Sequence, residues 1–253
     1  MSSDPDPSSA FDARDYWRSR LNRRPDLTGT GTIGLALPWQ CWMYRGKERA
    51  YGHLLRRAEF RFTGCRVLDF GCGTGHFEDH WESRGAARAD GIDIVPESIE
   101  RLQTSYPERR YTCGDIGRDP DLLATFGEYD LVTAIDVLYH LVDDACLENA
   151  LTALLARVRP GGYFLFTEGV QSGLTAQHVR FRSLDSWQIR MDQLGLQIVD
   201  RTPVFVLNNR KTRFAVSAPW LAGALCHSAD AVALRLFPRR ANNWALLAAR
   251  VAA

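Results

Sequence analysis

Glycines and acidic residues follow a short apolar segment in the first third of the chain. Residues 66–70 read Arg-Val-Leu-Asp-Phe, and residues 71–75 read Gly-Cys-Gly-Thr-Gly. Glycines at such a turn let a ligand approach the main chain closely, at the edge where open α/β sheets bind ligands. Asp69 precedes the first glycine by two residues, and His76 stands where a dinucleotide-binding fingerprint has its last glycine. A pyrophosphate ligand is therefore disfavoured at this turn.

Two further acidic residues have the spacing of a nucleoside-binding site. Asp93 ends the next apolar segment, 22 residues after Gly71. This position suits a carboxylate that accepts hydrogen bonds from two ribose hydroxyls. Asp115 ends a third segment, directly after Cys113 and Gly114, where it would face an adenine amino group. The alternatives are a helix cap or turn residue for Asp93 and a turn residue for Asp115.

Strands that alternate with helices position these residues, an order typical of a parallel sheet covered on both faces. We expect strands over 66–70, 89–94, 110–115, 129–135, 163–167, 196–207 and 243–251. We expect helices over 76–82, 96–104, 146–158, 184–194 and about 219–237. Pro160-Gly161-Gly162 is expected to stop the third of these helices.

The chain divides into a tail, a helical segment and one larger domain. Residues 1–10 are rich in Ser, Asp and Pro, so we expect a disordered tail. Residues 11–60 hold eight of the 27 aromatic residues in an irregular helical pattern, and we expect a helical cap or lid there. Residues 61–253 form the main domain. Its segment 208–242 is too long for a hairpin connection and is a candidate cover for the site.

Composition narrows the class of protein. The 253 residues carry 31 basic and 30 acidic side chains, so no overall field attracts nucleic acid or an anionic membrane. The six cysteines form no C-x-x-C pair, and no cluster of His, Asp and Glu has ligand spacing, so we expect no metal. No leader sequence and no membrane-spanning apolar window is evident. We expect a cytoplasmic protein without nucleic-acid or membrane partners, of undetermined oligomeric state.

The glycine turn, the acidic residues after it and the Arg-Pro-Gly-Gly turn at 159–162 together resemble the class I S-adenosylmethionine-dependent methyltransferase family. The resemblance spans about residues 61–167. It implies an α/β fold with a Rossmann-like seven-stranded sheet and helices on both faces, with S-adenosyl-L-methionine as the cofactor of an enzyme that transfers methyl groups. The cofactor-binding residues that it implies are Asp69, Gly71, Cys72, Gly73, Thr74, Gly75, Asp93, Ile94, Asp115, Ile116, Ile135 and Asp136.

The resemblance also implies distinct roles within that set. The glycine turn would lie under the methionine portion of the cofactor, with Asp69 positioning its amino group directly or through water. Asp93 would bind the ribose. The adenine would lie between Asp115 and Ile116. The sulfonium side would be lined by Ile135 and Asp136.

Methyl transfer needs alignment and, for an O–H or N–H acceptor, a place for the proton. The resemblance places residues 136–141 at the acceptor pocket, so His140 is the best candidate for a base and Asp136 is a second catalytic candidate. Tyr139 is a candidate for binding substrate. His178 is a further candidate base and substrate contact. The alternative for each histidine is local packing, and Asp143 and Asp144 are expected to cap the next helix.

The remaining substrate candidates lie outside the resembling segment. Tyr16 and Trp17 belong to the aromatic residues that would cover an apolar acceptor, although ordinary helix packing explains them equally well. Arg182 closes the segment that contains His178. The basic cluster at 209–213 is a candidate contact for a carboxylate or phosphate, with a solvated loop as the alternative.

The acceptor is expected to be a small molecule. Residues 135–138 read Ile-Asp-Val-Leu and lack the Pro-Pro-Tyr type of motif found in enzymes that methylate the amino groups of nucleic-acid bases. Cys146 lies in a predicted helix and does not suit an RNA cytosine-5 nucleophile. We therefore expect O- or N-methylation of a small molecule, in specialised metabolism. The alternatives are a protein or RNA methyltransferase, or an enzyme of the same fold that catalyses a non-methylating reaction.

Overall fold

The computed structural model describes residues 11–169, 173–207, 218–241 and 243–250. The predicted tail at 1–10 and the basic cluster at 209–213 lie outside the described residues. Among the described helices, none combines the length and apolarity that crossing a bilayer requires.

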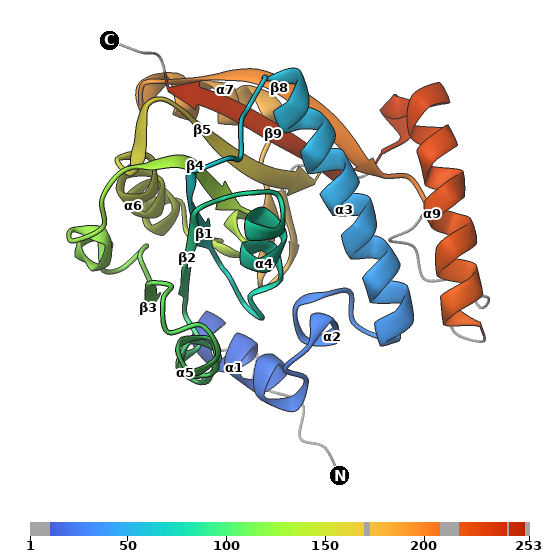
Figure 1. Cartoon of the computed structure of the whole chain (residues 1–253), viewed down its shortest axis with the longest axis horizontal. Helices are drawn as coiled ribbons and strands as arrows, with labels where there is room; N and C mark the ends of the chain where they lie inside the picture. Colours follow the sequence, from blue (N-terminus) through green and yellow to red (C-terminus); the bar gives the residue numbers. More distant parts are fainter. Residues whose placement is uncertain (1–10, 170–172, 208–217, 242, 251–253) are drawn as a thin grey trace.

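Seven apolar strands form one mixed sheet (Figure 1). They are β1 (Arg66–Phe70), β2 (Arg88–Asp93), β3 (Tyr111–Cys113), β4 (Tyr129–Ala134), β5 (Val158–Gly169), β8 (Leu196–Phe205) and β9 (Asn243–Arg250). The order is β3-β2-β1-β4-β5-β9-β8. The first five strands are parallel, and β9 runs antiparallel to both β5 and β8. The predicted fold class is confirmed.

Helices cover both faces of this sheet, because successive strand residues point to opposite sides. The covering helices are α3 (Leu37–Arg57), α4 (His76–Ser83), α5 (Pro96–Ser105), α6 (Asp144–Leu155) and α7 (Leu184–Gln193). Val67 of β1 packs in one core with Trp39 of α3 and Trp81 of α4. Its neighbour Leu68 packs in a second core with Trp187 of α7 and with α6. The glycine turn between β1 and α4 is thereby held between two rigid layers.

The segment before the sheet forms α1 (Ala13–Arg23), α2 (Leu27–Thr30) and α3. Trp39, Tyr51 and Leu54 of α3 are buried against the sheet, so this helix is part of the main hydrophobic core. Helix α1 contributes no residue to this core and α2 contributes only the partly buried Leu27, so α1 and α2 are the helices that suit the cover that the sequence predicts. Their role as a lid stays a prediction.

Two regions differ from the sequence prediction in detail. Helix α6 ends at Leu155, and Pro160-Gly161-Gly162 lies within β5, at a register shift between Tyr129 and Leu131 of β4. The segment after β5 contains a hairpin of β6 (Gly173–Ala176) and β7 (Val179–Phe181) that was not predicted. Three short 3-10 helices, η1 (Pro120–Leu123), η2 (Leu138–His140) and η3 (Pro238–Arg240), connect the larger elements.

The long segment before β9 contains α9 (Pro219–Leu236), as the apolar pattern predicts. Figure 1 shows α9 lying beside α3, at the edge of the molecule. The indole of Trp42 on α3 packs against Trp220 and His227 of α9. The expectation that this segment covers the site is therefore wrong for its helical part, because α9 packs on the outer side of α3.

Candidate active site

A cavity opens at the carboxyl ends of the central parallel strands. It holds about 980 Å³ of space not filled by atoms, including its open mouth. Twelve of the residues named from the sequence line it: Trp17, Gly71, Cys72, Gly73, Thr74, Asp93, Ile94, Asp115, Ile116, Ile135, Asp136 and His140. The topology therefore brings together residues that lie more than 100 positions apart in the chain.

The glycine turn presents bare backbone to this cavity in conformations that favour glycine. Gly71 has φ +77° and Gly73 has φ +55°. A Cβ atom at Gly71 would lie 2.8 Å from Val137, and one at Gly73 would lie 2.7 Å from the Cγ2 atom of Thr30. Both glycines are therefore required by close approach as well as by backbone angle. Gly75 begins α4 with φ +83° and does not line the cavity.

Asp93 holds the turn and also faces the cavity. Its Oδ2 atom accepts a hydrogen bond of 2.9 Å from the N–H of Gly73, and its Oδ1 atom accepts one of 3.0 Å from Val95. Burial raises the pKa of this carboxyl, against the effect of these backbone bonds. Each carboxylate oxygen has two lone pairs, so the carboxylate retains acceptor capacity for a ligand hydroxyl.

Asp115 and Ile116 line the next part of the cavity. The Oδ1 atom of Asp115 accepts a hydrogen bond of 3.0 Å from the N–H of Gly117, which fixes the turn after β3. The side chain of Ile116 is fully buried. Together with Ile94 and Ile135, these residues form an apolar wall with a single carboxylate at its edge, a combination that suits a flat ring with an amino group.

Asp69 does not reach the cavity. It is buried beneath the glycine turn, where its carboxyl accepts a hydrogen bond from the hydroxyl of Thr133. Burial raises the pKa of Asp69 to about 7. Glu78 of α4 is fully buried beside it, and burial together with the charge of Asp69 raises the pKa of Glu78. Because Asp69 is not among the residues that line the cavity, this arrangement favours the second of the two possibilities considered, contact with the cofactor amino group through water.

Asp136 forms the polar centre of the cavity wall. It has φ +55°, an unusual angle for a residue with a side chain. Its N–H donates to Oγ1 of Thr167 at 2.7 Å, and that hydroxyl donates to Oδ1 of Asp136 at 2.9 Å. Its Oδ2 atom lies 2.6 Å from the Nζ atom of Lys47. Hydrogen bonds to Thr167 and the ion pair with Lys47 therefore hold Asp136 in this strained backbone conformation.

Lys47 and Asp136 share one charged pair at the wall of the cavity. Burial opposes the charge on each residue, but the partner outweighs it, so the pKa of Lys47 is raised and that of Asp136 is lowered. Burial and the charge of Asp136 raise the pKa of Tyr139, which is not itself a lining residue. Both members of the pair are ionised at neutral pH.

His140 lies on the same wall as a neutral imidazole. Its Nδ1 atom lies 2.6 Å from the carbonyl oxygen of His178, and a carbonyl only accepts, so Nδ1 carries the proton. Burial lowers the pKa of His140 to about 4. Nε2 of His140 therefore keeps a free lone pair for a proton at neutral pH.

Aromatic side chains from α1 cover His140. The rings of Trp17 and His140 lie 4.9 Å apart, edge to face. The rings of Tyr16 and His178 lie 4.6 Å apart at an angle of 33°, and the Tyr16 hydroxyl lies 3.3 Å from Nε2 of that histidine. Trp17 lines the cavity, whereas Tyr16 and His178 lie one layer further out. The structure thus assembles the predicted aromatic residues, with only one of them reaching the cavity.

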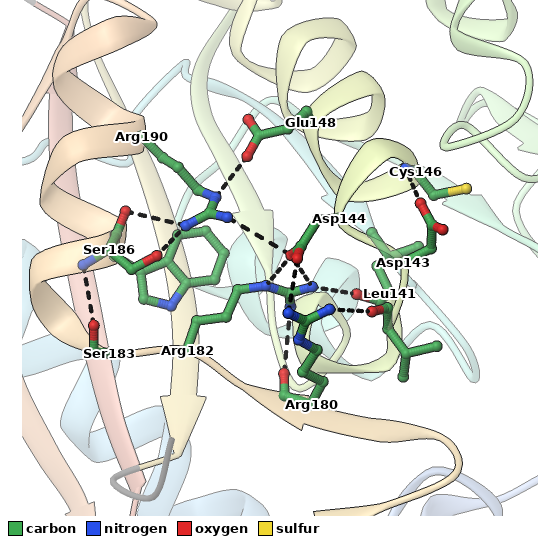
Figure 2. Close-up of polar contacts among 12 residues, drawn as sticks. Leu141, Asp143, Asp144, Cys146, Glu148, Arg180, Arg182, Ser183, Ser186 and Arg190 are labelled. Atoms are coloured by element: carbon green, nitrogen blue, oxygen red, sulfur yellow. Dashed lines mark hydrogen bonds and ion pairs between the residues drawn. The ribbon is translucent and has the colours of Figure 1, made fainter. Parts of the chain in front are cut away.

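Arg182 is not among the residues that line the cavity, and its role as a substrate contact stays a prediction. Its guanidinium donates to Oδ1 of Asp144 at 2.9 Å and to the carbonyl of Leu141 at 2.8 Å. Figure 2 shows Asp144 meeting Arg180, Arg182 and Arg190. These pairs fasten the β6–β7 hairpin to the loop that carries His140. Asp143 caps α6 as predicted, through a bond from the N–H of Cys146.

Sequence reasoning missed the contribution of α3 and α2. Lys47, Tyr44 and Thr30 all line the cavity. The hydroxyl of Tyr44 lies 2.7 Å from that of Thr30, and its ring lies 4.1 Å from Nζ of Lys47. One signal was available: Lys47 is one of two lysines in a chain with 31 basic residues, and it follows Tyr44 at the spacing of one helix face.

Comparison with known proteins decides the family. A family profile described as "Methyltransferase domain" matches residues 43–201, well over half of the chain. The chain belongs to this family. The matched segment is an S-adenosylmethionine-dependent methyltransferase domain, as the sequence resemblance implied, with S-adenosyl-L-methionine as its cofactor.

Individual relatives are more distant. The malonyl-[acyl-carrier protein] O-methyltransferase of Pectobacterium atrosepticum is 30% identical over 156 residues, or 60% of this chain and 58% of that protein. The matches span about half the length of the curated relatives. The methyltransferase is therefore assigned at the level of family, and its acceptor is not.

Solved structures show the same fold over nearly the whole chain. Magnesium protoporphyrin IX methyltransferase from Synechocystis PCC 6803, with bound S-adenosylmethionine, has TM-score 0.60 at 17% identity and covers 96% of this chain and 99% of its own. The N-methyltransferase NodS from Bradyrhizobium japonicum WM9, in complex with S-adenosyl-L-homocysteine, has TM-score 0.59 at 17% identity and covers 93% and 99%.

The residues of this methyltransferase fit the cofactor. Gly71 and Gly73 line the cavity, so their main-chain atoms are exposed to a ligand without an intervening side chain. Asp93 offers acceptor sites for hydroxyl groups, and the wall formed by Ile94, Ile116 and Ile135 offers an apolar surface. The donor set and the shape therefore match a nucleoside that carries an extended amino-acid chain.

Proposed function

We propose that this methyltransferase transfers the methyl group to an oxygen or nitrogen atom of a small molecule, such as a specialised metabolite. The observation that carries the proposal is the part of the cavity beyond the glycine turn. There a neutral His140 and the charged pair of Lys47 and Asp136 lie among aromatic side chains, beneath α1. A cavity enclosed in this way suits a small acceptor better than a polymer.

The cofactor-binding part of the proposal assigns a role to each group. The backbone at Gly71 to Thr74 lies along the methionine portion, Asp93 accepts from the ribose hydroxyls, and Asp115 with Ile116 borders the adenine. When bound, S-adenosylmethionine supplies a methyl carbon already activated by a sulfonium. Asp69 acts from beneath, by fixing the turn through Thr133 and, through water, the cofactor amino group.

The acceptor part of the proposal concerns the proton. Nε2 of His140 takes the proton that an O–H or N–H acceptor loses, since Nδ1 is held by the carbonyl of His178. Lys47 places an ammonium group beside the position where negative charge would develop on an acceptor oxygen. Asp136 orients that ammonium group. Trp17 and Tyr44 exclude water and align the acceptor.

The printed names of the similar proteins support small acceptors on both oxygen and nitrogen. The Pectobacterium relative is named an O-methyltransferase, and the Bradyrhizobium structure is named an N-methyltransferase. These names and the enclosed cavity both argue against a nucleic acid as the methyl acceptor.

The test is a screen that detects the demethylated cofactor. The enzyme would be incubated with S-adenosylmethionine and a panel of phenols, carboxylic acids and amines, and product masses would be checked for a gain of one methyl group. Methylation of a panel member, lost in His140→Gln while calorimetry still shows cofactor binding, supports the proposal. Label from the cofactor that enters only the protein or RNA fraction of a cell extract would overturn it.

A further inference from the structure

The outer side of α9 exposes a stripe of large apolar side chains. Six of the eleven large apolar side chains that are exposed in the described part of the chain belong to residues 220–237, and each is between 52% and 64% exposed. They are Trp220, Leu221, Leu225, Val232, Leu236 and Phe237. A patch of this kind marks a surface that binds something apolar.

The stripe cannot turn inward, because the opposite face of α9 is fixed. A Cβ atom at Gly223 would lie 2.6 Å from Trp42 of α3, so the two helices are in close contact there. Asp230 is buried, and its Oδ1 atom accepts hydrogen bonds of 3.0 Å from Val206 and 2.7 Å from Leu207. These contacts hold the helix in one rotation about its axis, with the stripe outward. Helical spacing places Leu221, Leu225, Val232 and Leu236 on that one side.

The exposed charged side chains at the carboxyl end of the stripe are all positive. Arg235, Arg239 and Arg240 are exposed at and just beyond the carboxyl end of α9. Asp230 is the one acidic residue between 218 and 241, and it is buried. The prediction of no membrane partner came from the near-zero net charge of the whole chain. That sum does not reveal this local excess of positive charge.

We propose that α9 docks this enzyme on an anionic lipid surface. Exposed Trp, Leu and Phe side chains with adjacent arginines are the combination that lies in the headgroup boundary of a bilayer without crossing it. The outward Leu and Val side chains enter the acyl boundary, and the three arginines contact lipid phosphates. The inference concerns a surface remote from the cavity and does not depend on which acceptor is methylated.

A second copy of the chain is the competing occupant. The helix of 18 residues is about 27 Å long, and a stripe about 10 Å wide along it falls well short of the roughly 800 Å² that each partner buries in a stable interface. The arginines add nothing to an apolar helix pair, whereas each adds to binding at an anionic surface. A lipid surface therefore accounts for both the apolar stripe and the exposed arginines, whereas a dimer accounts for the apolar stripe alone.

The test is sedimentation of the full chain with vesicles. We expect the protein to bind vesicles of phosphatidylcholine with 30 mol% phosphatidylglycerol about 10-fold more tightly than vesicles of phosphatidylcholine alone. Each arginine that contacts the anionic surface can contribute at most roughly fivefold to this preference. The double variant Leu225→Glu/Val232→Glu should lose at least 10-fold in binding. Arg239→Glu/Arg240→Glu should lose the preference for the anionic lipid.

The matched control is Ile189→Glu, a change of the same type at a residue of α7 that is 58% exposed. It should bind vesicles as the wild type does, and all variants should bind S-adenosyl-L-homocysteine normally in calorimetry. Wild-type protein that stays in solution with anionic vesicles would overturn the proposal. So would a dimeric mass in light scattering that the double variant reduces to a monomer, because that result assigns the stripe to a second copy.

Discussion

The ammonium nitrogen of Lys47 on α3 lies 2.6 Å from a carboxylate oxygen of Asp136, which follows β4. The two residues are 89 positions apart, and Asp136 is held at φ +55°. The pair joins the helix that covers the sheet to the loop that carries His140. It is therefore a structural junction as well as a feature of the cavity wall.

Loss of Lys47 should destabilise the protein. Lys47→Met keeps the length of the side chain but leaves a part-buried carboxylate without its ion pair, which costs about 3 to 5 kcal/mol of unfolding free energy. Neutralising the carboxylate as well, in Lys47→Met/Asp136→Asn, should recover part of that loss. Denaturant unfolding monitored by circular dichroism measures both.

The control for this prediction is Arg18→Met. Arg18 pairs with Glu97 on the surface, so its loss should leave the unfolding midpoint unchanged. A Lys47→Met midpoint equal to that of the wild type would show that the pair contributes nothing to stability. A double variant no more stable than Lys47→Met would show that the unpaired charge is not the cause.

Gly73→Ala should be more damaging than a glycine substitution that only strains the backbone. Gly73 has φ +55° and faces Thr30, whereas Gly64 has φ +78° with open space around it. Gly64→Ala therefore measures the backbone cost alone, about 1 to 2 kcal/mol. Gly73→Ala adds a contact of 2.7 Å and displaces the cofactor cradle.

Calorimetry with S-adenosyl-L-homocysteine separates the two effects. We expect Gly64→Ala to bind as the wild type does and Gly73→Ala to bind at least 10-fold more weakly. Adding Thr30→Ser to Gly73→Ala removes the contacting Cγ2 atom and should restore part of the affinity. Equal affinities of Gly73→Ala and Gly64→Ala would contradict the close packing of α2 on the glycine turn.

The part of the site that the sequence predicted is the part built from local pattern. Residues 71–74 follow β1, Asp93 ends β2 and Asp115 lies two residues after β3. Such strand ends meet at one edge of a parallel sheet. Recognising the strands was therefore enough to bring these residues together. The family resemblance implied that Asp136 and His140 lie at the acceptor pocket, and both line the cavity.

Residues brought in by tertiary packing were not predictable in this way. Lys47 reaches the cavity only because α3 packs across the sheet, and nothing in its neighbourhood encodes a partner 89 residues later. Arg182 was expected to bind substrate, but the β6–β7 hairpin turns it toward Asp144. The hairpin strands β6 and β7, of four and three residues, carry too little alternation for the sequence pattern to reveal them.

Asp93→Asn should weaken cofactor binding without unfolding the turn. The amide keeps one oxygen that can accept from backbone N–H groups. It offers fewer and weaker acceptor sites to the two ribose hydroxyls than the carboxylate does. We expect a 10- to 100-fold rise in the dissociation constant for S-adenosyl-L-homocysteine. Asp119→Asn, at an exposed position after β3, is the matched control and should leave binding unchanged. Unaltered binding by Asp93→Asn would remove Asp93 from the cofactor site.

Stability should fall on the acid side of neutrality because of His140. Burial lowers the pKa of its imidazole to about 4, below the ordinary value of 6.5, so between these two pH values the unfolded chain binds a proton that the folded protein does not. The free energy of unfolding therefore falls as pH falls from 6.5 toward 4 and is unaffected by this group above 6.5. From pH 7 to pH 5 the loss due to His140 is about 2 kcal/mol.

Denaturant unfolding at both pH values should show this loss in the wild type and in the control His53→Gln, whose histidine is exposed, and a smaller loss in His140→Gln. A loss of the same size in His140→Gln would mean that other groups set the pH dependence and that His140 is not held neutral by its surroundings.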